Sequence, residues 1–210
     1  MAQYKKAIYS ILICTVFLGT ICRAASGSQG YALYRDGVAL NLNWHGGLLV
    51  EPSTYNYGDA IVQASGFNTN TSYVAYNRFL DGNTFMGVYR PFTIMSDHQK
   101  DLVVATARTL AGRGIGYILE DQMKASSTSS KFYPQHIQSL RCDGVIEYCY
   151  EYNGIKVYGG NNWDISKNSE AEISAHKGFY NINPKRQAEL YLNKLSTIRQ
   201  IEERRVGKEC

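Results

Sequence analysis

The stretch that decides the fold of this chain spans residues 141 to 151 and reads Arg141-Cys142-Asp143-Gly144-Val145-Ile146-Glu147-Tyr148-Cys149-Tyr150-Glu151. It indicates a turn that leads directly into a helix. Four apolar residues recur at the i, i+3, i+4 and i+7 spacing of one helical face, namely Cys142, Val145, Ile146 and Cys149. We expect Ser139 to be the N-cap and Asn153-Gly154 to end the helix. The stretch therefore predicts a helix with a cysteine in its first turn.

A thiol in the first turn of a helix is a candidate nucleophile. It lies next to unpaired backbone N–H groups and the positive end of the helix dipole, which favour the thiolate form. The alternative is that Cys142 is a small buried side chain that only packs. We expect Cys149, one heptad further on, to belong to the core. The two cysteines would lie roughly 10 Å apart along the helix axis, too far for a disulfide.

We expect neither end of the chain to belong to the folded domain. Two lysines precede an apolar run from Ala7 to Cys22, which is typical of a signal peptide ending after Ala24. We therefore expect residues 1–24 to be removed and the protein to be exported, to the periplasm or the medium. An uncleaved N-terminal anchor is the alternative. Residues 202–210 resemble the translation of a sequencing adapter, and we treat them as an artefact rather than as an ordinary charged helix end.

The charge that remains is nearly balanced. Residues 1–25 hold three basic residues and no acids, and residues 202–210 hold three of each, which leaves 16 basic and 15 acidic residues. This balance does not indicate a nucleic-acid partner or an anionic membrane. Residues 27–201 have the length of one domain with a core of its own. Its oligomeric state does not follow from the sequence.

The N-terminal half of this domain indicates strands and the rest mainly helices. An Asp36-Gly37 turn signal stands between two short strands, and a C-terminal helix is expected from Pro184, with an apolar stripe that continues through Leu192, Leu195 and Ile198. Further strands are expected at 43–50, 60–64 and 84–90, a weaker one at 155–158, and a helix with a capping box at Ser96. We expect an α+β fold with a small antiparallel sheet packed against helices.

A thiol nucleophile needs a base, and four histidines are available. His45 lies on an expected strand and is followed by two glycines, which remove side chains where another element must approach closely. Gln63 lies on the next expected strand and could face it. We expect His98 to be solvated and His136 to be a weak rival in a loop, and His176 lies in irregular sequence with no supporting pattern. His45 as a purely structural residue is the alternative.

The cysteine stretch resembles the nucleophile helix of NlpC-type papain-like cysteine peptidases, which have Cys-Ser/Asp-Gly followed by two aliphatic residues. His45-Gly46-Gly47-Leu48-Leu49-Val50 is similar to their histidine strand, and Ala60-Ile61-Val62-Gln63-Ala64 to the strand with the third polar residue. Gly116-Tyr117 resembles their Gly-x-Tyr element. Here the histidine precedes the cysteine, an order that resembles the circularly permuted branch of YiiX-like amidases and, more distantly, lecithin:retinol acyltransferase-like proteins.

This resemblance implies a papain-like fold and a Cys-His thioester mechanism. Cys142 would attack a carbonyl, His45 would accept the thiol proton, Gln63 would orient the imidazole and Tyr117 would help to stabilise the oxyanion. Glu51, at the end of the histidine strand, is a competing orienter because the gap between His45 and Gln63 is longer than usual in the family. No cofactor is implied, and no metal-ligand spacing is found in the sequence.

Three functions remain open. The first is a secreted or periplasmic cysteine hydrolase that cleaves an amide bond in a cell-wall peptide or a small amide. The second is a lipid acyltransferase or esterase, although the Asn-Cys-Glu-His step of the acyltransferase branch does not occur and no basic amphipathic helix would apply it to a membrane. The third is a catalytically silent binding module on the same fold.

Overall fold

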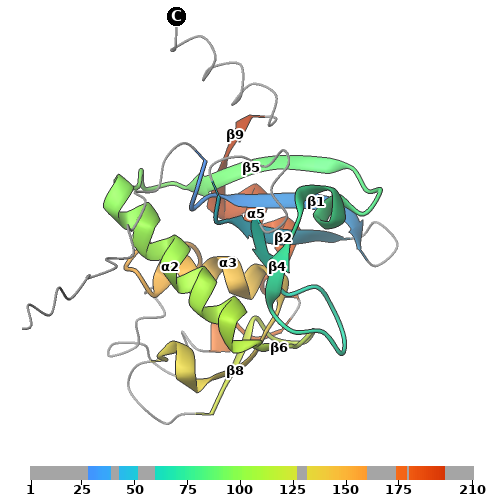
Figure 1. The fold of residues 1–210 in the computed structure, drawn as a ribbon, viewed down its shortest axis with the longest axis vertical. Helices are drawn as coiled ribbons and strands as arrows, with labels where there is room; N and C mark the ends of the chain where they lie inside the picture. The colour runs from blue at the N-terminus through green and yellow to red at the C-terminus, as the bar shows by residue number, and fades with distance from the viewer. Residues whose placement is uncertain are drawn as a thin grey trace, which may run out of the picture.

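The computed structural model describes residues 28–38, 43–51, 60–126, 132–159, 174–178 and 180–196. They form a mixed α+β fold in which a six-stranded antiparallel sheet packs against helices (Figure 1). The strand order is β4-β3-β2-β1-β5-β9, so the histidine strand β2 lies inside the sheet. The strands are β1 (Ala32–Val38), β2 (Asn43–Leu49), β3 (Ile61–Gln63), β4 (Ser72–Val74), β5 (Phe85–Pro91) and β9 (Leu192–Ser196).

A second, three-stranded sheet lies close to the cysteine. Its strands are β6 (Gly116–Tyr117), β7 (Met123–Ala125) and β8 (Ile137–Leu140). The strand order is β6-β8-β7, with β6 parallel and β7 antiparallel to β8. Strand β8 follows a short 3₁₀ helix, η1 (Pro134–His136), and ends two residues before Cys142. The small sheet therefore delivers the chain to the start of the cysteine helix.

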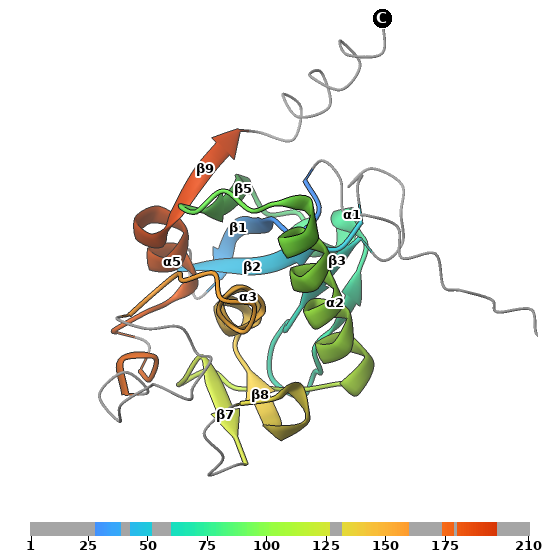
Figure 2. The same cartoon turned by 90° about the vertical axis from the view of Figure 1, so that its left-hand side faces the viewer.

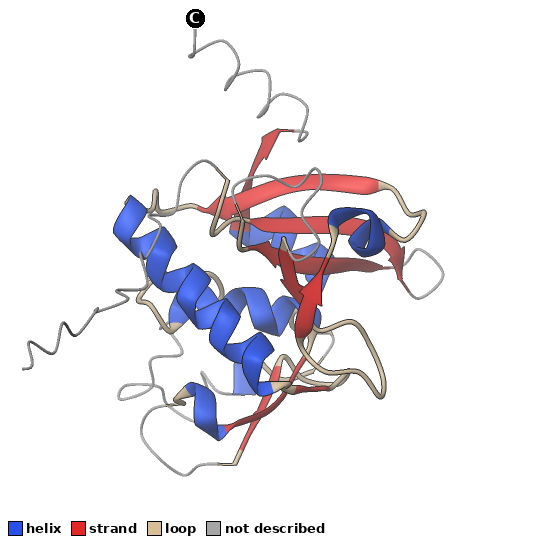
Figure 3. Ribbon diagram, in the orientation of Figure 1, coloured by secondary structure: helices blue, strands red, loops and turns tan. Residues whose placement is uncertain are grey.

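The cysteine helix α3 (Cys142–Glu151) lies between the two sheets (Figure 2). All ten of its residues are buried. The main core also includes residues of α2 (Asp97–Arg113) and α5 (Pro184–Tyr191), on the same side of the large sheet as α3. Figure 3 shows α2 to the left of and below the strands, α3 below them and α5 behind them. A helix that is buried all round has no solvent face, so its polar side chains need partners inside the protein.

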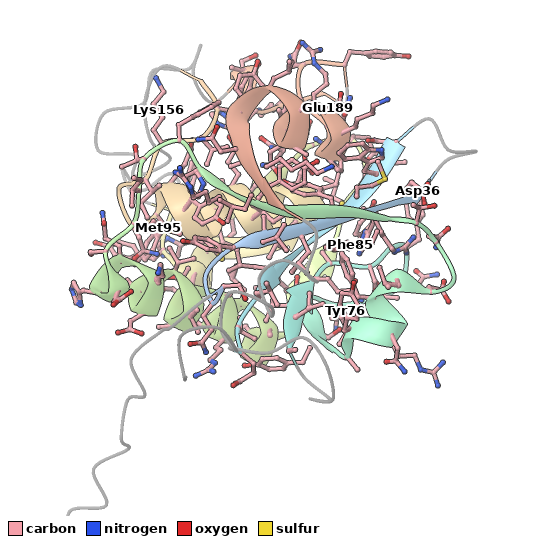
Figure 4. The ribbon with its side chains drawn as sticks, turned by 90° about the horizontal axis from the view of Figure 1, so that it is seen from above. Asp36, Tyr76, Phe85, Met95, Lys156 and Glu189 are labelled. Atoms are coloured by element: carbon pink, nitrogen blue, oxygen red, sulfur yellow. The ribbon has the colours of Figure 1, made fainter. Side chains whose placement is uncertain are left out.

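A smaller core covers the opposite face of the large sheet. It contains Phe79 of the short helix α1 (Tyr76–Leu80), together with Leu33, Leu49 and Ile61 from the strands. Figure 4 shows Tyr76 of α1 beside Phe85 of β5, and their rings meet edge to face at 5.8 Å. The sheet is therefore covered on both faces, and this accounts for the complete burial of strand β2.

Several elements form where local sequence signals predicted them. Helix α2 begins with the capping box at Ser96, whose hydroxyl accepts from the Gln99 N–H while the Gln99 side chain accepts from the Ser96 N–H. Helix α5 begins at Pro184, with Asn183 as its N-cap. Strand β5 lies where the sequence predicted it. Among the described residues, none of the helices has the length and apolar character needed to cross a membrane.

Other expectations were wrong. Ser139 is not the N-cap of α3: it lies in strand β8, and Arg141 takes the capping position without a side-chain cap. Asp36-Gly37 is not a turn between strands, because β1 continues to Val38 through a shift in its register with β2. Residues 155–158 form no strand. Each of these signals spans four residues or fewer, and contacts with distant segments override local signals of that length.

The C-terminal helix is shorter than its apolar stripe suggested. Helix α5 ends at Tyr191, and Leu192–Ser196 forms the edge strand β9, which pairs with β5. Leu192 and Leu195 are three residues apart, which is a helical spacing in the sequence, but in β9 they fall on opposite faces of the strand, and Leu192 is buried while Leu195 is exposed. The exposed N–H and C=O groups of β5 favour the strand at this edge. The expected signal peptide and residues 202–210 lie outside the described residues.

Glycines mark the places where elements approach closely. A Cβ at Gly46 would lie 2.7 Å from the Ile146 Cδ1 atom of α3, and one at Gly47 would lie 2.6 Å from the Ile61 Cγ2 atom of β3. At Gly144 a Cβ would lie 1.9 Å from the carbonyl oxygen of Gln122. The glycines after His45 and Cys142 thus let the helix and strands come together at the candidate site.

Replacing Gly144 with alanine should destabilise the fold by about 3 kcal/mol, because backbone at Gln122 occupies the place of the new methyl group. Gly112→Ala is the matched control: it lies in helix α2 with nothing within 4 Å of the new Cβ, so it should stabilise by about 1 kcal/mol. Chemical denaturation of both variants tests this expectation. Equal stabilities would contradict the close approach of Gly144 to Gln122.

Candidate functional site

His45 and Gln63 come together on neighbouring strands. Strands β2 and β3 pair with Leu48 opposite Val62. The Nε2 atom of His45 and the Oε1 atom of Gln63 are 2.7 Å apart, and both side chains are buried. An amide oxygen only accepts, so this bond assigns the imidazole proton to Nε2 and leaves Nδ1 as an acceptor. The His45 ring also packs against Phe79, with the ring centroids 5.4 Å apart.

Cys142 is the first residue of α3 and lies against strand β2. Its thiol accepts hydrogen bonds from the backbone N–H groups of Gly46 and Asp143. Gly46 directly follows His45, so the candidate nucleophile contacts the strand next to the candidate base. Both cysteines are buried: Cys142 is 4% exposed and Cys149 is completely buried. Both are free thiols, as their expected spacing required.

The expected thiolate does not form in the resting site. Burial raises the pKa of the Cys142 thiol to about 12, the carboxylate of Asp143 adds to the increase, and the N–H groups of Gly46 and Asp143 offset only part of it. Burial lowers the pKa of His45 to about 4, with a further contribution from the charge of Arg35. Desolvation therefore outweighs the stabilisation of the thiolate by the helix N-terminus. At neutral pH the pair is a thiol and a neutral imidazole.

Tyr117 reaches the same place from the small sheet. Strand β6 pairs with β8 so that Tyr117 lies opposite Leu140, two residues before Cys142. Burial and the negative charge that Cys142 would carry raise the pKa of the Tyr117 hydroxyl above its usual range. The phenol consequently stays protonated and can act as a hydrogen-bond donor. Its ring meets the exposed ring of Phe67 edge to face at 5.7 Å.

Glu51, the competing orienter, has a different partner. Its Oε1 atom lies 2.7 Å from Nη2 of Arg108 on helix α2, and the same nitrogen donates to the carbonyl oxygen of Val50. The hydrogen bond described for the His45 ring is the one that its Nε2 donates to Gln63 Oε1. The structure thus pairs His45 with Gln63 and places Cys142 against Gly46, the residue after His45, with Tyr117 close enough to act on Cys142 through space, whereas Glu51 binds α2.

A buried ion pair at the start of α3 was missed by the sequence analysis. The Arg141 guanidinium donates to both carboxylate oxygens of Asp143 at 2.6 and 2.9 Å, and both side chains are almost completely buried. Its remaining donors reach the carbonyl oxygens of Leu119 and Ile182. Three distant segments are therefore tied together at the residue before the candidate nucleophile.

The carboxylates of α3 continue this polar network along the helix. Glu147 Oε2 accepts from the side-chain amides of Gln122 and Gln187, each at 2.7 Å. Asp143, Glu147 and Glu151 follow one another at four-residue intervals, so they form a row on one helical face. This row was the available signal, because three carboxylates on one helical face require cations or amide donors nearby if that face is buried.

His176 is not the unsupported residue that the sequence suggested. It is buried, with Nε2 3.0 Å from Glu147 Oε1 and 3.6 Å from Glu151 Oε2. Burial by itself lowers its pKa, but the two carboxylates outweigh that effect and raise the pKa to about 10. Burial and the charge of Glu147 raise the pKa of Glu151 to about 7. His98 is exposed and His136 half-buried, so neither belongs to the site.

The Glu147, Glu151 and His176 side chains are also the one group among the described residues that could hold a metal ion. Each offers a ligand atom, and these atoms lie within 4.8 Å of one another. The sequence shows no metal-ligand spacing because the histidine comes from a distant segment. A protonated imidazole between two carboxylates satisfies the same geometry.

Comparison of this chain with family models, curated proteins and solved structures gives no match. A functional argument therefore depends on the geometry of the site itself and on the resemblance of its motifs to the NlpC-type peptidases.

Replacing Arg141 with leucine should cost about 3 to 5 kcal/mol of stability, because it leaves the Asp143 carboxylate buried without its cation. Arg108→Leu is the control, since its pair with Glu51 is partly exposed and should contribute about 0 to 1 kcal/mol. Urea denaturation of the two variants gives the comparison. A similar loss in both would mean that the buried network does not hold the start of α3.

Proposed function

We propose that this protein is a secreted or periplasmic cysteine hydrolase that cleaves an amide bond, in a cell-wall peptide or a small amide, through a Cys142 thioester. The proposal includes a papain-like fold in the permuted order of the NlpC-type peptidases. One observation carries it: the Cys142 thiol lies against Gly46, while the adjacent His45 is held by Gln63 at 2.7 Å. The chain supplies these groups in the order that the family resemblance implies.

The first step in this mechanism forms the thioester. His45 Nδ1 accepts the proton of the Cys142 thiol as Sγ attacks the substrate carbonyl carbon. Negative charge develops on the carbonyl oxygen, where the N–H of Cys142 is a suitable donor because a first-turn N–H has no acceptor within its helix. The Tyr117 hydroxyl is a second donor. The imidazolium then protonates the leaving amine as the carbon–nitrogen bond breaks.

The second step releases the acid. A water molecule gives a proton to His45 and attacks the thioester carbonyl, and the collapse of the tetrahedral intermediate returns that proton to the Cys142 sulfur. Gln63 keeps the proton on Nε2 throughout, so that Nδ1 always faces the reaction. A neutral amide stabilises the imidazolium less than a carboxylate would. Weak stabilisation of the imidazolium is consistent with a resting site in which the Cys142 thiol and the His45 imidazole are both neutral.

A catalytically silent binding module is the second candidate, and the burial of Cys142 favours it. Burial raises the pKa of the Cys142 thiol to about 12. Such a thiol is expected both for an inert packing cysteine and for a nucleophile that loses its proton only to a neighbouring base. The two candidates differ in whether His45 increases the reactivity of Cys142. None of the described contacts favours the lipid acyltransferase or esterase alternative in the same way.

Acylation by p-nitrophenyl acetate separates the candidates. The hydrolase should form an acetyl-enzyme on Cys142, detected by acid quench and peptide mass spectrometry, and His45→Ala should slow its formation roughly 100- to 10,000-fold. Gln63→Ala should cause a smaller loss, and Cys149→Ala should keep the wild-type rate. Acetylation of Cys142 that is unaffected by His45→Ala would favour the binding module.

The pH dependence of this acylation follows from the two pKa values. Because the pKa of His45 is about 4, its imidazole is free to accept a proton above that pH and is blocked below it. The thiol keeps its proton until about pH 12. The rate of acetyl-enzyme formation should therefore rise through pH 4 and stay level from about pH 5 to 9. A bell-shaped profile centred near pH 6 would instead indicate a preformed thiolate–imidazolium pair.

A further inference from the structure

Arg35 is the direct cross-strand neighbour of His45. In the antiparallel pairing of β1 with β2, Arg35 lies opposite His45, one step from the pair formed by Tyr34 and Gly46. Side chains of directly opposed residues project on the same face of a sheet, with Cβ atoms roughly 5 Å apart. The guanidinium therefore originates beside the candidate base, on the strand that is central to the sheet.

The guanidinium has donors to spare. Nη1 of Arg35 donates to the carbonyl oxygen of Asp36 at 3.0 Å. Its Nε atom is buried and has no hydrogen-bond partner. Arg35 forms no ion pair with any residue that the structure describes, although Asp81 and Asp36 act on it through space. A half-buried cation usually has a carboxylate partner, so Arg35 keeps donor capacity for an anionic ligand.

The charge of Arg35 acts on both reacting residues. It lowers the pKa of His45, and the Cys142 side chain is among the groups that raise the pKa of Arg35. A cation in this position makes His45 a weaker base, which opposes the first step of the proposed reaction. An anion bound at Arg35 would remove that effect. The arrangement suits a reaction that begins only when a negatively charged substrate is in place.

We propose that Arg35 binds a carboxylate of the substrate beside the scissile bond, so that the enzyme acts on acidic amides or peptides. This inference rests on the proposed hydrolase function and names its substrate class. The planar guanidinium matches a carboxylate through two parallel hydrogen bonds, which a lysine ammonium does not reproduce. Arg35 is then a specificity residue that positions the substrate relative to Cys142 and His45.

Two alkylating reagents test the charge preference without a known substrate. Iodoacetate and iodoacetamide attack the same thiol and lose the same iodide, but only iodoacetate carries a carboxylate. Mass spectrometry at pH 8.5 gives the rate of each reagent at Cys142. The rate with iodoacetate divided by the rate with iodoacetamide should be about tenfold higher in the folded protein than in the same protein unfolded in urea. Arg35→Gln should lose this preference, and Arg35→Lys should keep only part of it.

Arg90→Gln is the matched control. Arg90 also lies on a central strand, β5, and its Nη1 atom donates to the carbonyl oxygen of Pro91 at 2.9 Å, but it is not opposite His45. This variant should keep the wild-type ratio. An unchanged ratio in Arg35→Gln, or no preference in the folded wild type, would overturn the inference. Cys142 reacting no faster than Cys149 with either reagent would instead overturn the proposed function.

Discussion

The structure depends on the buried ion pair between Arg141 and Asp143. It stands at the start of α3 and also binds the backbone at Leu119 and Ile182, so three segments that are distant in sequence converge there. Burying two charges is unfavourable unless every donor and acceptor is satisfied. Here the guanidinium and the carboxylate bind each other through two hydrogen bonds, and Gln122 donates to the same carboxylate at 3.1 Å. The position of Cys142, between the two paired residues, follows from this network.

The same ion pair influences the chemistry of the site. The carboxylate that fixes the helix also raises the pKa of the neighbouring thiol, and burial does so more strongly. The candidate nucleophile is therefore kept as a thiol, and in the proposed mechanism its reactivity comes from His45, which Gln63 orients. Arg35 shifts the base in the same direction, towards the neutral form. In such a site stability and resting reactivity oppose each other, and a substrate that neutralises Arg35 would change the balance.

Much of the site was predictable, because its signals are local or lie on adjacent strands. The spacing of Cys142, Val145, Ile146 and Cys149 predicted helix α3. The glycines after His45 predicted a close approach by another element, and at Gly46 that element is Ile146 of α3. The pairing of His45 with Gln63 followed from one hairpin. The fold was predictable to the level of an antiparallel sheet packed against helices. The helix expected through Leu195 was wrong, because an open strand edge at β5 decided the structure of that segment.

The sequence by itself determined which residues have the right chemical type and which local elements carry them. Helical period, strand alternation, capping residues and glycines act over a few residues, so they can be recognised without coordinates. The tertiary structure decided which charged groups form ion pairs and which groups are buried away from water. His176 joined Glu147 and Glu151, and Arg35 came to lie opposite His45, through contacts between segments far apart or through strand register. Desolvation depends on everything packed around a group, and for that reason the protonation state of Cys142 could be learned only from the fold.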